Sequence, residues 1–285
     1  MTAGAADRLS ALRREIARVG GGTNHRPAGT AGSILAGQSA LTPLFASGHA
    51  FGALHEILAA TPPDLFAATG FAVDFVAACA RVRPRAGFVL IVEDFVVWET
   101  GMLYGPGLVE AGLDPARLLV VRTHDPRETL VAMETALRSC AVAGVLAESA
   151  ISARLYDLAT SRRLLLAARK GGGAALLLPT AFAGHAMNLS SAATARFEIA
   201  RAPGRSLPFG WARLPMPGRP AFSFRLLKAP GDLTGAAART REQWRDGVSG
   251  VPLEEAAYHA FSFHPSAVSA DGSHSPARGD VRLSA

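Results

Sequence analysis

The sequence predicts an α/β fold, with a mostly parallel β-sheet flanked by helices and an antiparallel extension toward the C-terminus. Three observations lead to this prediction. Continuous apolar runs, typical of strands buried on both faces, alternate with longer segments of helical spacing. The connections between them are short, as in parallel sheets with helical crossovers. From Thr194 onward, strand-like segments follow one another through turns rich in Pro and Gly, which favours antiparallel pairing.

The core is expected to begin with a short strand at Ala53–Leu58 and a helix at Leu65–Arg83, which Pro84 ends. The run GFVLIVE at Gly87–Glu93 is uniformly apolar until its last residue and predicts a strand buried on both faces. The elements expected after it are a short helix at Tyr104–Gly112, a strand at Leu118–Arg122, a helix at Asp125–Cys140, a strand at Val142–Glu148, a helix at Ser152–Lys170 and a strand at Ala174–Thr180.

The C-terminal part is expected to extend the sheet. Three segments, Thr194–Arg201, Phe209–Leu214 and Ala221–Lys228, have strand composition and no helix between them. Short helical pieces are expected near Gly235–Asp246 and at Leu253–Phe261, where apolar residues have helical spacing.

The chain divides into five segments by composition. Residues 1–22 have apolar residues at helical spacing and predict a helical arm that stands apart from the core. Residues 23–48, rich in Gly, Ala, Ser and Thr, are expected to form a flexible linker. Residues 49–230 form the predicted core and 231–264 a C-terminal helical segment. The polar residues 265–285 are expected to be a disordered tail.

Charge and cysteine content favour a cytoplasmic protein that meets an acidic partner or a polyanion. Residues 1–150 carry 12 Arg against 14 Asp and Glu, whereas residues 151–285 carry 15 Arg and 2 Lys against 9 Asp and Glu. Cys79 and Cys140 are isolated in apolar patterns, so we expect two buried free thiols in a reducing compartment. The apolar stretch Leu65–Ala80 contains Asp74 and falls short of the ~20 residues that a membrane span needs, so no membrane association is expected.

The turn after the first predicted strand cannot form a phosphate-binding loop. Such a loop has the pattern G-x-x-x-x-G-K-[ST], in which glycine backbone donors and a lysine hold phosphate oxygens. Here the turn reads AATPPD, from Ala59 through Thr61 and Pro62 to Asp64. The two prolines have no N–H to donate, and Asp64 adds negative charge at a helix start, where it would repel a nucleotide.

Other catalytic patterns are also missing. The eight histidines have no metal-ligand spacing, so no metal and no cofactor are expected. No G-x-S-x-G nucleophile turn occurs. Glu93 and Asp94 follow the second predicted strand and are either a solvated strand end or an acid pair at the ligand-binding edge of an open sheet. Glu148 also ends a predicted strand.

Several strings in the chain resemble one family in combination. They are GALHEI at 52–57, LYGPGL at 103–108, AGLDPARLL at 111–119, AMETALRS at 132–139 and SRRL at 161–164. Together they are similar to ImuA, the RecA-like accessory protein of the bacterial mutagenesis cassette. The resemblance covers roughly residues 50–230, which is most of the predicted core.

The resemblance implies a RecA-like core and a role in SOS-induced, error-prone translesion DNA synthesis. The implied partners are ImuB, an inactive relative of Y-family polymerases, and an error-prone DNA polymerase. By the same resemblance, Ala59–Asp64 replaces the Walker loop, Glu93 or Asp94 approaches the catalytic glutamate, Glu148 replaces a magnesium-site aspartate, and Tyr104 falls near the tyrosine that stacks on adenine. Without the loop, we interpret these positions as a degenerate nucleotide site and expect no ATPase activity. Tyr104 is then expected to be a core or turn aromatic residue.

The basic half of the chain is the candidate surface for single-stranded DNA or a protein partner. Aromatic residues, among them Phe209, Trp211, Phe222 and Phe224, are interleaved with the arginines. They either stack on bases or form the core of the sheet beneath a basic face. The candidate contact residues are Arg201, Arg205, Arg213, Arg219, Arg225, Lys228, Arg239, Arg241, Trp244 and Arg245.

Two other functions remain open at this level. One is a cell-division inhibitor of the SulA type, which also lacks the phosphate loop. The other is an ATPase that still uses nucleotide through Glu93, Tyr104 and Glu148. The N-terminal arm also leaves open a homo-oligomer, because the corresponding arm of RecA packs on a neighbouring subunit.

Overall fold

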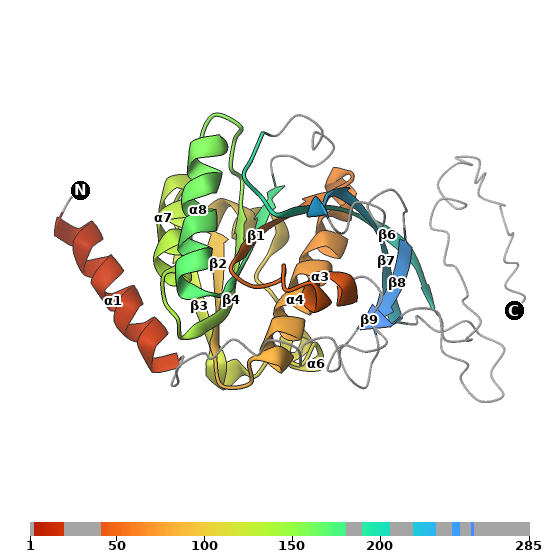
Figure 1. Ribbon diagram of the computed structural model, residues 1–285, viewed down its shortest axis with the longest axis horizontal. Coiled ribbons are helices and arrows are strands. Elements are labelled where there is room, and N and C mark those ends of the chain that lie inside the picture. Colours follow the sequence, from red (N-terminus) through yellow and green to blue (C-terminus); the bar gives the residue numbers. More distant parts are fainter. Residues whose placement is uncertain are drawn as a thin grey trace, which may run out of the picture.

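The computed structural model describes residues 3–19, 41–180, 190–205, 219–231, 241–245 and 252–253. Within these ranges one sheet has the strand order β3-β2-β4-β5-β1-β6-β7-β8-β9 (Figure 1). The strands are β1 (Ala53–Ala59), β2 (Gly87–Glu93), β3 (Leu118–Thr123), β4 (Val142–Ser149), β5 (Ala174–Pro179), β6 (Ala195–Arg205), β7 (Arg219–Lys228), β8 (Arg241–Arg245) and β9 (Pro252–Leu253). The helices are α1 (Ala3–Val19), α3 (Thr42–Ala46), α4 (Leu65–Val82), α5 (Asp94–Thr100), α6 (Gly105–Glu110), α7 (Pro126–Leu137) and α8 (Leu158–Gly171), with short 3₁₀ turns η1 (Pro62–Asp64) and η2 (Pro115–Arg117).

The sheet is parallel from β3 to β6 and antiparallel from β6 to β9. The strand β1 lies between β5 and β6, so the chain leaves the centre of the sheet, builds one side from β2 and β3, and returns through β4 and β5. This order differs from the 3-2-1-4-5-6 order of dinucleotide-binding sheets. The predicted fold class, a mostly parallel sheet flanked by helices with an antiparallel C-terminal extension, is confirmed.

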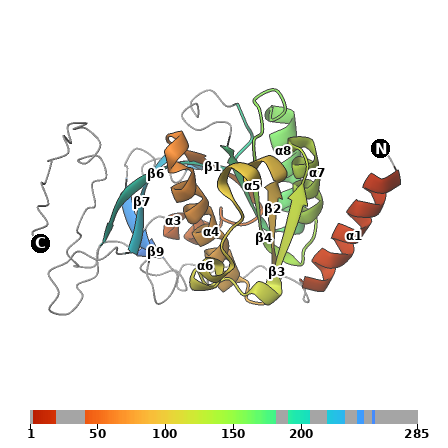
Figure 2. The same ribbon diagram turned by 180° about the vertical axis from the view of Figure 1, so that it is seen from behind.

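Helices cover the two faces of the sheet in separate layers (Figures 1 and 2). The core on one side is built on α4, and the core on the other side on α7 and α8. Alternate residues of β5 point to opposite layers: Leu176 and Leu178 join the α4 side, whereas Ala175 and Leu177 join the α8 side. This alternation explains why the inner strands are apolar at every position.

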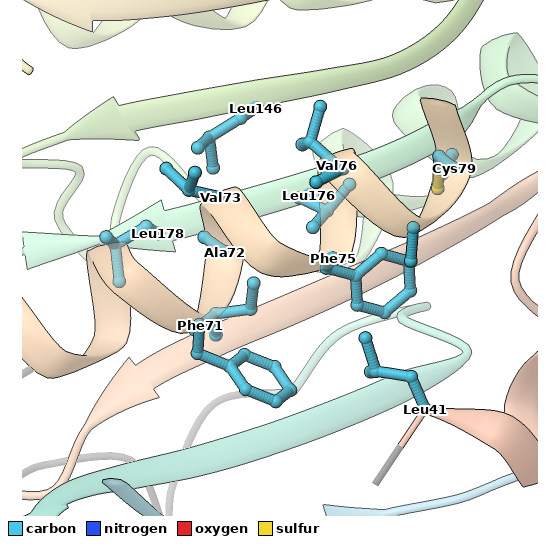
Figure 3. Packing of buried hydrophobic residues seen from close by; sticks show 14 of the residues in the cluster. Leu41, Phe71, Ala72, Val73, Phe75, Val76, Cys79, Leu146, Leu176 and Leu178 are labelled. Atoms are coloured by element: carbon cyan, nitrogen blue, oxygen red, sulfur yellow. The ribbon is translucent and has the colours of Figure 1, made fainter. Parts of the chain in front are cut away.

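The α4 layer is centred on two aromatic side chains of that helix. Phe71 and Phe75 are fully buried, and their rings lie 5.1 and 6.3 Å from that of Phe197 on β6, on the side of α4 away from Leu146 (Figure 3). The ring of Phe71 lies 5.4 Å from that of Phe222 on β7. Phe222 and Phe224 are both buried, so the structure makes these two residues part of the core and excludes them as a platform for bases.

The N-terminal segments contact the core more closely than their composition suggests. The helix α1 packs on α7 and buries Ile16, so this arm does not stand apart from the core. The expected flexible linker is wrong for residues 41–48, because α3 lies there and Leu44 and Phe45 are buried against the α4 layer. The apolar side chains of this short helix decide its position, not the small residues around it. Residues 20–40 lie outside the described part.

The C-terminal region adds strands where helices were expected. Arg241–Arg245 is β8, which pairs with β7 in an antiparallel register, so the helix expected near 235–246 is wrong there. The open edge of β7 offers a ladder of backbone hydrogen bonds that outweighs the helical spacing of a few side chains. Pro252–Leu253 forms β9 at the start of the second expected helix. The rest of that helix and the strand expected at Phe209–Leu214 lie outside the described residues.

Cys79 is buried as expected, but Cys140 is exposed because it follows the end of α7 in the turn to β4. The stretch Pro62–Val82 is long and apolar enough to cross a membrane by composition alone, but two thirds of it is buried inside the protein. Its apolar residues are therefore accounted for by packing against the sheet.

Candidate functional site

The turn between β1 and α4 is closed by the chain's own carboxylate. Asp64 is 4% exposed and its Oδ2 accepts hydrogen bonds from the backbone N–H of Thr61, at 3.0 Å, and from the Thr61 hydroxyl. Its Oδ1 accepts the backbone N–H of Arg201 on β6, at 3.0 Å. Thr61 and Asp64 thus form a capping box at the start of η1.

Each residue from 60 to 64 either donates its backbone N–H to an acceptor within the protein or is a proline without an N–H. Ala60 donates to the carbonyl oxygen of Ile199 at 2.8 Å, and Asp64 donates to that of Thr61 at 2.9 Å. The N–H of Thr61 is bonded to the Asp64 carboxylate, and Pro62 and Pro63 have none. The turn therefore offers no donor of its own to a phosphate, and it places a buried carboxylate where a phosphate-binding loop would need positive potential.

Replacing Asp64 with alanine should lower the free energy of unfolding by about 1–2 kcal/mol, because two backbone donors and the Thr61 hydroxyl lose their acceptor. Urea denaturation measures this change. The exposed Glu110→Ala on α6 is the control and should change stability by less than about 0.5 kcal/mol. An Asp64→Ala protein as stable as the control would show that this carboxylate does not hold the turn.

Glu93 and Asp94 diverge at the end of β2. Glu93 is 4% exposed, and its Oε2 accepts the Ser149 hydroxyl and, at 2.8 Å, the backbone N–H of Ala150, so it ties β2 to the end of β4. Asp94 points to the surface and contacts Arg122 and His124 at the end of β3, at 2.6 and 2.8 Å. The hydrogen bond from His124, then that from Arg122, lowers the pKa of Asp94. The two acids therefore do not act as a pair.

Glu148 lies at the base of a pocket of about 320 Å³ between the start of α4 and the loop before α6. The side chain is 5% exposed, and its Oε1 is buried with no hydrogen-bond partner among the described residues. Burial raises the pKa of Glu148 to about 7, and a hydrogen bond from the Thr69 side chain opposes this shift. Of the predicted nucleotide-site residues, Glu148 and Tyr104 line this same pocket.

The pocket's outer wall is the loop that joins α5 to α6. Gly101 ends α5 with φ at +81°, a conformation that favours glycine, and this turn directs Met102 and Tyr104 toward the pocket. Tyr104 is 73% exposed and lies in the loop directly before α6, so the expectation of a core aromatic residue is wrong. A Cβ atom added at Gly107 would lie 3.5 Å from the Tyr104 ring, so this ring lies close to the glycine.

A buried polar network was missed by the sequence interpretation. Glu56, in the middle of β1, is fully buried; its Oε2 accepts Nε of Arg196 at 2.6 Å and its Oε1 accepts the Tyr156 hydroxyl at 2.7 Å. Arg196 also donates to the Ser191 hydroxyl at 3.0 Å. A charged residue inside an apolar strand is the signal that could have indicated such a network. Its partners come from distant segments and could not be identified locally.

The candidate basic surface is only partly within the described residues. Arg201 is exposed, with its guanidinium 3.8 Å from Asp64; Arg225 pairs with Glu198; and Lys228 donates to the backbone oxygen of Ser191 at 2.9 Å. The backbones of Arg205, Arg219, Arg241, Trp244 and Arg245 lie on β6, β7 and β8. The antiparallel strands thus bring these distant positions onto one part of the sheet. Arg213, Arg239, Phe209 and Trp211 lie outside the described residues.

In the part of the chain that the structure describes, no three His, Cys, Asp or Glu side chains are arranged to hold a metal ion. No protein-family model matches the chain, and no curated protein matches it.

Proposed function

We propose that this chain is a non-catalytic accessory factor of SOS-induced, error-prone translesion DNA synthesis. In this role it acts in the cytoplasm as an adaptor between an inactive Y-family polymerase relative of the ImuB type and an error-prone DNA polymerase. The resemblance of residues 50–230 to ImuA suggests the pathway. The fold class expected from that resemblance agrees with the sheet and its helices.

The observation that carries the non-catalytic part is the closed turn between β1 and α4. Phosphoryl transfer depends on donors and cations that position and neutralise the phosphates. Here the backbone donors are engaged, two positions are proline, and the carboxylate of Asp64 fills the turn. Glu93, the nearest analogue of a catalytic carboxylate, is already bonded to Ser149 and Ala150. These contacts support a binding role over a motor.

Co-purification tests the adaptor role. The full-length chain, expressed with an ImuB-like protein from the same operon type, should elute as a complex, and the purified chain should not hydrolyse ATP above the background. ATP turnover that Glu93→Gln abolishes would contradict the non-catalytic assignment. A chain that never co-elutes with the ImuB-like protein at micromolar concentration would contradict the adaptor role.

Binding to single-stranded DNA is a separate prediction. If the basic strands contact phosphates, replacing both Arg201 and Arg225 with serine should weaken binding several-fold. The dependence of binding on salt should also decrease, because a protein that makes fewer phosphate contacts releases fewer counterions from the DNA. Fluorescence anisotropy with a labelled oligonucleotide measures both. Arg169→Ser, which changes an exposed side chain on α8 outside the antiparallel strands, is the matched control and should leave binding unchanged. Equal losses in the two proteins would show that the antiparallel strands are not the DNA-binding surface, and no binding at low salt would remove DNA from the set of partners.

A further inference from the structure

Exposed apolar side chains gather around the mouth of the Glu148 pocket. Phe66 at the start of α4, and Met102 and Tyr104 in the loop before α6, line the pocket and are between 46% and 73% exposed. We call these three residues the pocket rim. The loop passes beside α4 on the side of the sheet opposite α7 and α8 (Figure 2). Such a concave site with an open apolar rim is typical of a surface that binds another molecule.

Two further exposed apolar residues lie on α5, the helix that precedes the rim loop. Trp98 is 84% exposed and Phe95 is 53% exposed, and their spacing of three places them on one face of this helix. A small ligand held in the pocket would leave these side chains in water. A protein segment that crosses the rim could cover them, and buried tryptophan and tyrosine side chains commonly dominate the energy of such contacts.

The base of the pocket holds an acceptor that lacks a donor. Oε1 of Glu148 is buried and receives no hydrogen bond from the described residues. A buried acceptor in this state costs free energy that an incoming donor would recover. This observation is independent of the rim, and it favours a ligand that carries hydrogen-bond donors at its tip.

The charge around the pocket selects a cation. The segment from 94 to 114 carries four acidic residues and no Lys or Arg. Two of them, Glu99 on α5 and Glu110 on α6, are exposed. Asp94 is already paired with Arg122 and His124, so Glu99 and Glu110 are the acids that would attract a positively charged group to this side.

We propose that this pocket is a docking site for a segment of a partner protein that inserts an arginine side chain. The guanidinium donates to Glu148, the aliphatic stem packs on Leu65 and Met102, and the planar head stacks near Tyr104. Residues that flank the arginine cover Trp98. This docking site would be one of the surfaces through which the adaptor binds a partner. It rests on the proposed function in one respect, which is that the occupant of the pocket is taken to be a protein.

Ligand-observed NMR on the full-length protein tests the pocket. The probes are N-acetyl-arginine-methylamide and its neutral isostere N-acetyl-citrulline-methylamide. The arginine compound should bind with a Kd of about 1 mM or tighter, and the citrulline compound at least about fivefold more weakly. Glu148→Gln, which preserves the side-chain shape, should reduce arginine binding to the citrulline level. Tyr104→Ala changes an exposed residue and should weaken it about threefold or more.

The matched control is Glu110→Gln, which removes an acidic charge from the same side without altering the pocket lining. It should change binding less than twofold. Equal binding of the two probes, or an effect of Glu110→Gln as large as that of Glu148→Gln, would overturn the arginine site.

A peptide distinguishes a protein segment from a free guanidinium compound. The peptide acetyl-Ala-Leu-Arg-Leu-Ala-amide should bind more tightly than the blocked arginine, and Trp98→Ala should remove that advantage. A peptide that binds no better than the blocked arginine would overturn docking of a protein segment. Because the probes contain no polymerase component, failure of the co-purification experiment would leave this result standing, and the reverse also holds.

Discussion

Replacing Arg196 with alanine should lower the free energy of unfolding by about 3–5 kcal/mol. Its guanidinium is the cation that faces the fully buried carboxylate of Glu56, at 2.6 Å. Removing it leaves that carboxylate without its charge partner inside the sheet, and the Tyr156 hydroxyl alone cannot compensate. Breaking one member of a buried pair costs much more than the pair itself contributes, because the other charge stays desolvated.

Urea denaturation of matched variants checks this prediction. The control is Arg225→Ala, which breaks the ion pair between β7 and Glu198 on β6, where the side chains are 47% and 19% exposed. That change should cost less than about 1 kcal/mol, because surface pairs are screened by water. The double variant Glu56→Leu with Arg196→Met should be more stable than Arg196→Ala, since no charge remains buried. A similar loss for Arg196→Ala and Arg225→Ala would show that the network does not hold the sheet together.

Replacing Glu148 with glutamine should raise the free energy of unfolding by about 3 kcal/mol at mildly alkaline pH. Burial raises the pKa of this carboxyl from 4.5 to about 7 in the folded protein. The folded state therefore binds the proton more tightly than the unfolded state does. The resulting stability is fully present below pH 4.5, declines as the pH rises, and is lost above about pH 7. Glutamine avoids this loss because it never ionises.

The pH dependence of stability provides a sharper test. Burial lowers the pKa of His55 from 6.5 to about 4, so its contribution is present above pH 6.5 and is lost as the pH falls through 4. In the wild-type protein the contributions of Glu148 and His55 change with pH in opposite directions. The Glu148→Gln protein lacks the first contribution, so its stability should fall more steeply on acidification than that of the wild type. Urea denaturation across this pH range measures both proteins.

A Glu148→Gln protein that is less stable than the wild type above neutral pH would contradict the prediction. It would mean that the ionised carboxylate is satisfied in the folded state. The predicted gain also bears on function, because the same substitution is expected to reduce arginine binding to the level of the citrulline compound. A residue whose removal stabilises the protein and weakens binding is one that serves the site at the expense of the fold.

The local sequence determined which segments are strands and helices in the core. The run GFVLIVE predicted β2 because an inner strand of a parallel sheet is covered on both faces. Asp125 and Pro126 predicted the start of α7, and the Asp125 side chain does accept two backbone N–H groups there. The two prolines after β1 excluded a phosphate loop from composition alone, since they have no N–H to donate.

Only the tertiary structure decided which distant side chains meet. Asp64 receives a hydrogen bond from a residue 137 positions away, and Glu148 shares a pocket with Tyr104 because β4 lies beside β2 in the sheet. The helix α5 was not predicted, because it begins directly after β2 and has too few residues for a helical pattern to emerge. Local spacing encodes backbone conformation within a few residues. The order of the strands in the sheet determines which strand ends are neighbours, and that order follows from packing of the whole core.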